Sequence, residues 1–175
     1  MCIRDRATPS QQTGQPSTDE MIERLAARLK QNPNDAGGWR MLAWSYARTE
    51  RFVEAASAYR KAIELAPDVA ALRSALGVAL VSVANGTVTD EAKELFAAAV
   101  KLDALDPQGR FYLGLARSQA GDGQGALDDW IAFMKEADPQ ATWLPELRER
   151  ITDLAADLGV DVLSLIHISE PTRPY

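Results

Sequence analysis

Residues 39–67 read WRMLAWSYARTERFVEAASAYRKAIELAP, and this stretch decides the fold. Its anchor residues fall at helical spacing on two successive faces: Trp39, Leu42 and Tyr46, then Ala55, Tyr59 and Ala62. The small alanines let two helix backbones approach, and the aromatic side chains fill the space between them. Pro67 then ends the second helix, because proline cannot continue it. The pattern predicts two antiparallel helices joined by a short turn.

This pattern resembles the tetratricopeptide repeat (TPR), whose period is about 34 residues. Two further copies follow the first, of which the nearer is degenerate, so we expect repeats at about 36–69, 70–106 and 107–140. The second repeat has a longer turn near Asn85-Gly86, because Leu76 and Ala92 are 16 positions apart where Leu42 and Ala55 are 13 apart. The predicted fold is all-α, a TPR-like superhelix of about eight antiparallel helices.

Further helices are expected at both ends of the repeats, giving a helical domain at 19–159. Ser17 and Glu20 have the spacing of a capping box, which predicts the start of a lead-in helix. A last helix at 142–158 carries one apolar stripe, and its charged residues, Glu146 among them, are expected to face away from the repeats. We interpret it as the capping helix that repeat arrays need.

The two ends of the chain have a different character. Residues 1–6 (MCIRDR) and 163–175 (LSLIHISEPTRPY) resemble translated sequencing-library adaptor, and residues 7–18 are typical of a flexible linker. Cys2 and His167, the only cysteine and histidine of the chain, both lie in the adaptor-like ends. Without those ends, the remaining sequence contains neither residue type.

The overall composition is that of a globular domain, with 46% hydrophobic and 25% charged residues. The formal net charge of −6 argues against a nucleic-acid partner. The sequence has no apolar run of the roughly 20 residues that a membrane span needs.

Four segments together resemble one particular family: MIERLAARLKQNPNDAGGWRMLAWSYAR, NGTVTDEAKELFAAAVKLDALDP, RFYLGLARSQAGDGQGALDDWIAFMKEADP and ATWLPELRERI. The family is the C-terminal periplasmic TPR domain of the c-type cytochrome biogenesis factor CcmI, also called CycH. The long turn at Asn85-Gly86, Trp130 and Trp143 are its most specific matches. The resemblance implies a periplasmic chaperone domain of an inner-membrane protein whose membrane part is absent from this chain. It also implies binding of the C-terminal helix of apocytochrome c, which is presented to the haem-ligation complex.

TPR arrays bind their partners on the concave face lined by the first helix of each repeat. The residues of these helices that are not needed for packing form an apolar strip with polar flanks, which suits an amphipathic helix. The predicted peptide-binding residues are Arg40, Trp44, Arg48, Ser74, Val78, Val81, Ser82, Phe111, Leu115 and Gln119. The alternative for Trp44 and Phe111 is burial against a neighbouring helix.

A second class of binding remains open, in which a generic TPR scaffold holds the carboxylate of another peptide. Arg40 and Arg48 would supply the cations for such a clamp. Trp44, however, occupies the position where clamps of this kind place an asparagine.

An enzyme, a metal site and a cofactor are not expected. Without histidine and cysteine the usual nucleophile–base pairs cannot form. The aspartates that are close in sequence, such as Asp103 and Asp106, are better explained as helix starts. Direct haem ligation is not expected either, since the methionines at 21, 41 and 134 lie in amphipathic patterns and are interpreted as core.

Overall fold

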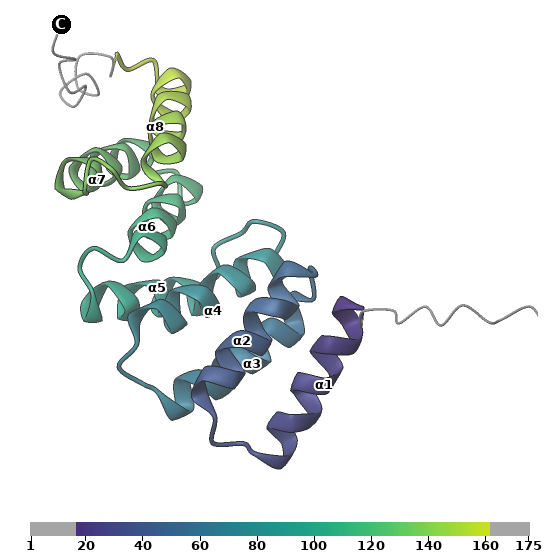
Figure 1. The fold of residues 1–175 in the computed structure, drawn as a ribbon. Helices are drawn as coiled ribbons and strands as arrows, with labels where there is room; N and C mark the ends of the chain where they lie inside the picture. The colour runs from purple at the N-terminus through teal and green to yellow at the C-terminus, as the bar shows by residue number, and fades with distance from the viewer. Residues whose placement is uncertain (1–16, 162–175) are drawn as a thin grey trace, which may run out of the picture.

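The computed structural model describes residues 17–161, which form eight α-helices and, within that range, no β-strand (Figure 1). The predicted all-α fold is therefore confirmed. The adaptor-like ends at 1–6 and 163–175, and residues 7–16 of the predicted linker, lie outside the described residues. In chain order the helices are α1 (Thr18–Gln31), α2 (Ala36–Arg48), α3 (Phe52–Leu65), α4 (Ala70–Val83), α5 (Asp90–Leu102), α6 (Pro107–Gln119), α7 (Gly123–Glu136) and α8 (Leu144–Leu158).

The helices are stacked as antiparallel pairs along one direction (Figure 1). Helices α2 and α3, α4 and α5, and α6 and α7 form the pairs, and each pair packs on the next through α3 with α4 and α5 with α6. Helix α4 also contacts α6 directly, so the first helices of the second and third pairs are neighbours. Helices α1 and α8 close the two ends of the array by packing on α2 and α7.

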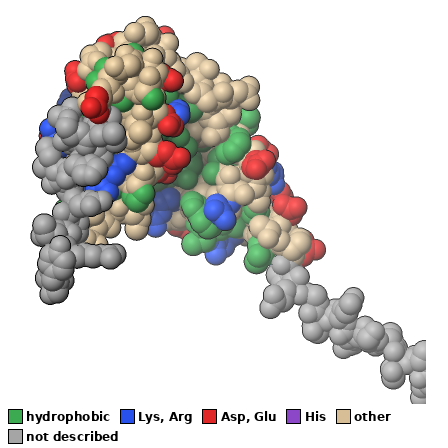
Figure 2. Space-filling view, turned by 90° about the horizontal axis from the view of Figure 1, so that it is seen from above, with side chains coloured by type: hydrophobic (Ala, Val, Ile, Leu, Met, Phe, Trp, Pro, Cys, Tyr) green, Lys and Arg blue, Asp and Glu red, His purple; other side chains and the backbone are tan. Residues whose placement is uncertain are grey.

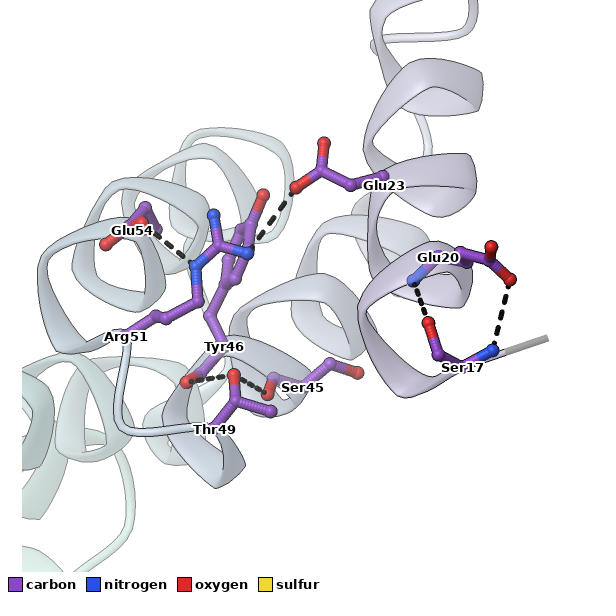
Figure 3. Close-up of polar contacts among 8 residues, drawn as sticks. All are labelled: Ser17, Glu20, Glu23, Ser45, Tyr46, Thr49, Arg51 and Glu54. Atoms are coloured by element: carbon purple, nitrogen blue, oxygen red, sulfur yellow. Dashed lines mark hydrogen bonds and ion pairs between the residues drawn. The ribbon is translucent and has the colours of Figure 1, made fainter.

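The helix ends follow the local chemistry of their residues. The Ser17 hydroxyl accepts from the Glu20 amide at 3.2 Å, and the Glu20 carboxylate accepts from the Ser17 amide at 3.1 Å, which confirms the predicted capping box (Figure 3). Helix α8 begins at Leu144, two residues later than expected, and Trp143 is its N-cap. It ends at Leu158 and is followed by the C-cap Gly159, whose φ of 68° favours glycine.

Arg51 ties the lead-in helix α1 to the first repeat (Figure 3). Its guanidinium donates to Glu54 at 3.0 Å and to Glu23 of α1 at 3.4 Å. The same group lies 4.5 Å from the centre of the Tyr46 ring. Burial raises the pKa of the Tyr46 hydroxyl, and the nearby Arg51 charge opposes that shift. The hydrogen bond from Arg51 lowers the pKa of Glu54.

The core has two parts with different residue types. An alanine-rich core between α1, α2, α3 and α4 contains Ala43, Ala55 and Ala62, all fully buried, which confirms the close helix approach predicted for these positions. An aromatic core between α7 and α8 contains Trp130 and Phe133 with the apolar stripe of α8.

The long turn between α4 and α5 is held by α6. Asn85 and Gly86 adopt positive φ values of 52° and 90°. The side-chain amide of Gln119, the last residue of α6, contacts this turn through two hydrogen bonds. It donates to the Gly86 carbonyl at 2.8 Å and accepts from the Val88 amide at 2.9 Å. Val88 thereby packs against the buried cluster of Val81 with its neighbours on α5.

Candidate peptide-binding surface

The predicted binding residues on α2 are exposed. The Trp44 side chain is 59% exposed, and Arg40 and Arg48 are also exposed. The Arg48 guanidinium lies 5.7 Å from the centre of the Trp44 ring, within the range of a cation–π contact. Since Trp44 is not used by the core, the alternative of burial against a neighbouring helix is wrong for this residue.

Two predicted binding residues on α4 are buried. Ser74 is only 1% exposed, and its hydroxyl donates at 3.1 Å to the carboxylate of Asp106, the N-cap of α6. Val81 is 5% exposed and packs with Phe96. The long turn explains the Val81 correction, because it folds Val88 over the end of α4.

Three more of the predicted residues already have partners within the fold. Val78 is half-buried against the same cluster as Val81. The Ser82 hydroxyl donates to the Val78 carbonyl at 3.1 Å. Gln119 uses its side-chain amide on the α4–α5 turn, as described above. These contacts leave the three side chains less free for a ligand than the sequence predicts.

The two predicted residues of α6 lie on the aromatic side of the molecule. Phe111 stacks on Trp130 with ring centres 5.5 Å apart, and Trp130 donates its indole N–H to the Phe111 carbonyl at 3.0 Å. Leu115 is half-buried and lines a small polar pocket of about 170 Å³ together with Trp130 and residues of α8. Phe111 also lines a larger pocket, described next.

A larger pocket of about 490 Å³, called here the aromatic pocket, lies where α4, α6 and α8 begin. Its position between successive first helices is the side on which TPR arrays bind. Figure 2 shows the surface hollowed between the two parts of the array, with hydrophobic side chains in and beside the hollow. The aromatic pocket is lined by Ala71, Ser74, Asp106, Pro107, Gln108, Phe111, Tyr112, Phe133, Trp143, Glu146 and Leu147.

Ring contacts fix the walls of the aromatic pocket. Tyr112 meets the edge of Phe111 with centres 5.1 Å apart and stacks on Phe96 at 4.8 Å. Phe133 stacks on Trp143 at 4.7 Å, and the Arg110 guanidinium lies 5.0 Å from the Phe133 ring. A ligand would therefore meet a cavity that is already formed.

Two carboxylates border the aromatic pocket, and they differ in availability. Asp106 is buried and accepts from the Gly109 amide at 2.6 Å as well as from Ser74. Glu146 is exposed and has no hydrogen-bond or ion-pair partner among residues 17–161. Burial, and to a smaller extent the charge of Glu146, raise the pKa of the Tyr112 hydroxyl.

Helix α8 also contributes to this surface, which is not predicted from the sequence. Glu146 was expected to face away from the repeats, but it lines the aromatic pocket with Trp143 and Leu147. The error arose because α8 was interpreted only as a cap. The spacing of Trp143, Glu146 and Leu147 at i, i+3 and i+4 is the signal that places all three on one helix face.

Other expectations concern metals, haem and membranes. Met134 is buried as predicted, whereas Met21 and Met41 are 51% and 59% exposed, so their assignment to the core was wrong. Among the described residues there is no group of three or more His, Cys, Asp or Glu side chains that could hold a metal ion. No helix between residues 17 and 161 is both long and apolar enough to cross a membrane.

Comparison with known proteins adds a family to this geometry. Residues 4–143 match the model of the cytochrome c-type biogenesis protein H TPR domain. The cytochrome c-type biogenesis protein CycH of Bradyrhizobium diazoefficiens is 37% identical over 142 residues, covering 81% of this chain and 38% of the relative. The protein of the same name from Rhizobium meliloti is 35% identical over 136 residues, covering 78% of this chain and 36% of the relative.

Among solved structures, a crystal structure of MamA is similar in fold. It has a TM-score of 0.68 and 17% sequence identity, and the match covers 82% of this chain and 80% of MamA. At that identity the likeness concerns the fold alone, and it supports the TPR-like superhelix expected from the repeats.

Proposed function

Because the chain belongs to the cytochrome c-type biogenesis protein H TPR family, we propose that it acts in cytochrome c maturation by binding the C-terminal helix of apocytochrome c. The bound helix is then presented to the haem-ligation complex. The chain spans less than two fifths of the length of its CycH relatives. The proposed location is accordingly the periplasmic domain of a longer inner-membrane protein.

The observation that carries this proposal is the aromatic pocket on the side of the array formed by α4, α6 and α8. An amphipathic helix binds by placing apolar side chains, spaced by one helical turn, into a groove of this kind. Walls fixed by stacked rings reduce the ordering that binding would otherwise cost.

Exposed side chains on α2 supply a second contact region for the same helix. Trp44 and Met41 are each 59% exposed, and Arg48 lies beside Trp44. Tryptophan and arginine are the residue types that most often dominate the energy of an interface. No catalytic step is part of the proposal, since the domain would act by holding and presenting its partner.

Calorimetric titration of the full chain with a synthetic peptide of the C-terminal helix of an apocytochrome c from Bradyrhizobium diazoefficiens tests the proposal. We expect saturable binding that Trp44→Ala weakens about tenfold or more. Val53→Ala is the matched control, because Val53 is an apolar residue of α3 that is 67% exposed and lies on a second helix of a pair. Absence of saturable binding, or equal loss in both variants, would contradict the proposal.

The alternative is a generic TPR scaffold that binds the terminal carboxylate of an unrelated peptide. It is favoured by Arg40 and Arg48, which are exposed and pair with no carboxylate within residues 17–161. Amidating the C-terminus of the peptide separates the two functions. A carboxylate clamp would lose most of its affinity, whereas a helix held by its apolar face would bind almost unchanged.

A further inference from the structure

We infer that the aromatic pocket selects a helical segment in which a bulky apolar side chain lies one turn away from a lysine or arginine. The apolar side chain would enter the pocket, and the basic side chain would pair with Glu146 at its rim. This inference rests on the proposed function, because it names the chemistry by which the same surface would choose its peptide.

The size and walls of the aromatic pocket indicate which apolar side chain it would accept. A volume of about 490 Å³ falls within the range of small-ligand pockets, roughly 300–1,000 Å³. Phe111, Phe133 and Trp143 present ring faces and edges that favour another aromatic ring or a large aliphatic side chain. The stacked pairs Phe111–Trp130 and Phe133–Trp143 keep these walls in place without a ligand.

The preference for a basic side chain in the peptide follows from the charges around the aromatic pocket. Both carboxylate oxygens of Asp106 are already used, by Ser74 and by the Gly109 amide. Arg110 stacks on Phe133 and pairs with Glu136 at 3.4 Å, so its charge is also engaged. Glu146 is therefore the acidic lining residue that remains without a hydrogen-bond or ion-pair partner among those described.

An anionic ligand is disfavoured although helix starts converge at this pocket. Helix N-termini attract anions through their free N–H groups and positive dipole ends. Here Pro107 and Pro145 stand in the first turns of α6 and α8 and carry no N–H. Asp106 caps α6, and Glu146 places a negative charge in the first turn of α8. The remaining local charge is therefore negative, which favours a cation.

The hydroxyl of Tyr112 supports the same choice. Tyr112 lines the aromatic pocket, and burial raises the pKa of its hydroxyl. A protonated phenol can accept a hydrogen bond from an ammonium or guanidinium group that Glu146 has attracted. A basic side chain three or four positions from the anchor lies on the same face of a helix, so both contacts can form together.

The inference is tested with three 20-residue amphipathic model helices that carry one phenylalanine and, four positions later, lysine, glutamine or glutamate. Each is titrated against the full chain, its Glu146→Gln and Glu146→Lys variants, and Glu149→Gln. The last is the matched control, because Glu149 is an exposed glutamate of α8 that does not line the pocket. The wild type should bind the lysine peptide about three- to fivefold more tightly than the glutamine peptide. Glu146→Gln should abolish this preference, and Glu146→Lys should transfer it to the glutamate peptide.

The indole N–H signals in the NMR spectrum report where the peptide binds. Trp39 and Trp130 donate to backbone carbonyls, while Trp143 lines the aromatic pocket. Addition of the lysine peptide should shift the Trp143 signal and leave the Trp39 signal in place. Equal affinity for all three peptides, or an equal effect of Glu149→Gln and Glu146→Gln, would overturn the inference. Self-association that protects Trp143 and competes with peptide would also overturn it, because a second copy would then occupy the pocket.

The outcomes for the two proposals remain distinct. If the apocytochrome peptide binds in a Trp44-dependent way but substitution of Glu146 changes the affinity of no peptide, the proposed function stands and the inference about the aromatic pocket fails. If the affinities of the model helices depend on Glu146 as expected but the apocytochrome peptide does not bind, the inference about the aromatic pocket stands and the proposed function fails.

Discussion

The first and third repeats use the same helix arrangement but pack it with different residues. In the first repeat, Ala43 of α2 meets α3 across an alanine-rich core, with Tyr59 filling the remaining space. In the third repeat, Gly114 of α6 stands at the equivalent position and lies against the Trp130 ring of α7. The tryptophan of the third repeat therefore lies where a side chain on the facing residue would overlap it, whereas the first repeat has room for an alanine at this position.

This difference has a consequence for binding. Alanines pack two helices closely and leave the outward face of α2, with the exposed Trp44, as an open surface. Stacked rings lie between α6, α7 and the start of α8, and the aromatic pocket lies next to these rings. The two regions therefore offer a partner two kinds of contact, an exposed side chain at one end and a preformed cavity at the other.

Truncation of the large aromatic residue should have the largest effect. Trp130→Ala removes a side chain that is 1% exposed, so we expect a loss of about 3–5 kcal/mol in the free energy of unfolding. Trp130→Phe is the control, because it retains a six-membered ring that can stack on Phe111, although it loses the indole hydrogen bond and part of the buried volume. Urea denaturation measures both variants. A loss below about 1 kcal/mol for Trp130→Ala would show that the third repeat does not depend on this ring.

Enlarging the glycine that faces the ring should have the next largest effect. An added Cβ at Gly114 would overlap the Trp130 ring, so Gly114→Ala should cost about 1–3 kcal/mol. Gly37→Ala is the control, because a Cβ there would meet only Asp35 at an ordinary 3.5 Å. We expect Gly37→Ala to be neutral or to stabilise slightly, since alanine favours a helix more than glycine does. Thermal unfolding followed by circular dichroism compares the two. A neutral Gly114→Ala would show that the Trp130 ring does not require a glycine opposite it.

The sequence alone predicts the helix arrangement well because packing residues recur at fixed positions. The pattern of Trp39, Leu42 and Tyr46 specifies a helix face whatever lies around it, and the capping box at Ser17 is a local motif. The binding surface is harder to predict, because it depends on contacts between distant segments. The sequence predicts that Ser74 contacts a peptide, whereas in the structure its hydroxyl donates to Asp106, which lies 32 residues later in the chain.

The aromatic pocket illustrates the same limit. It combines residues of α4, α6, α7 and α8, and the interpretation of α8 as a simple cap directed Glu146 away from it. Of the predicted binding residues, Ser74 and Phe111 line this pocket, and Arg40, Trp44 and Arg48 are exposed on α2. Their role in binding a peptide remains a prediction.

A smaller effect is expected where the second repeat departs from the first. Its long turn depends on Gln119, so Gln119→Ala should lower stability by about 0.5–1.5 kcal/mol. The more specific readout is hydrogen exchange at the Val88 amide, which should become faster. Gln119→Glu is the control, because a carboxylate can still accept from Val88 while it cannot donate to Gly86. Unchanged exchange at Val88 in both variants would show that the turn holds its shape without α6.

The smallest effect concerns the ion pairs at the turns of the first and third repeats. Arg117 and the Gly125 amide lower the pKa of Asp122 below its ordinary value of 3.8, as Arg51 lowers that of Glu54 below 4.5. A carboxylate whose pKa is lowered by folding stabilises the folded state above its ordinary pKa, and this contribution disappears as the pH falls through the lowered value. Arg117→Gln should therefore raise the pKa of Asp122 towards 3.8 and leave that of Glu54 unchanged.

Titration of the side-chain carboxyl carbons by NMR between pH 2 and 6 measures both groups in one sample. Because Asp122 and Glu54 are exposed to solvent, we expect only local fraying at the start of α7 below pH 3.8, seen as faster exchange of the Gly125 amide. Arg117→Lys is the control that keeps the charge but loses the guanidinium geometry. Equal pKa values for Asp122 in the wild type and in Arg117→Gln would mean that the Gly125 amide alone lowers it. The two turns would then differ, since the pKa of Glu54 depends first on Arg51.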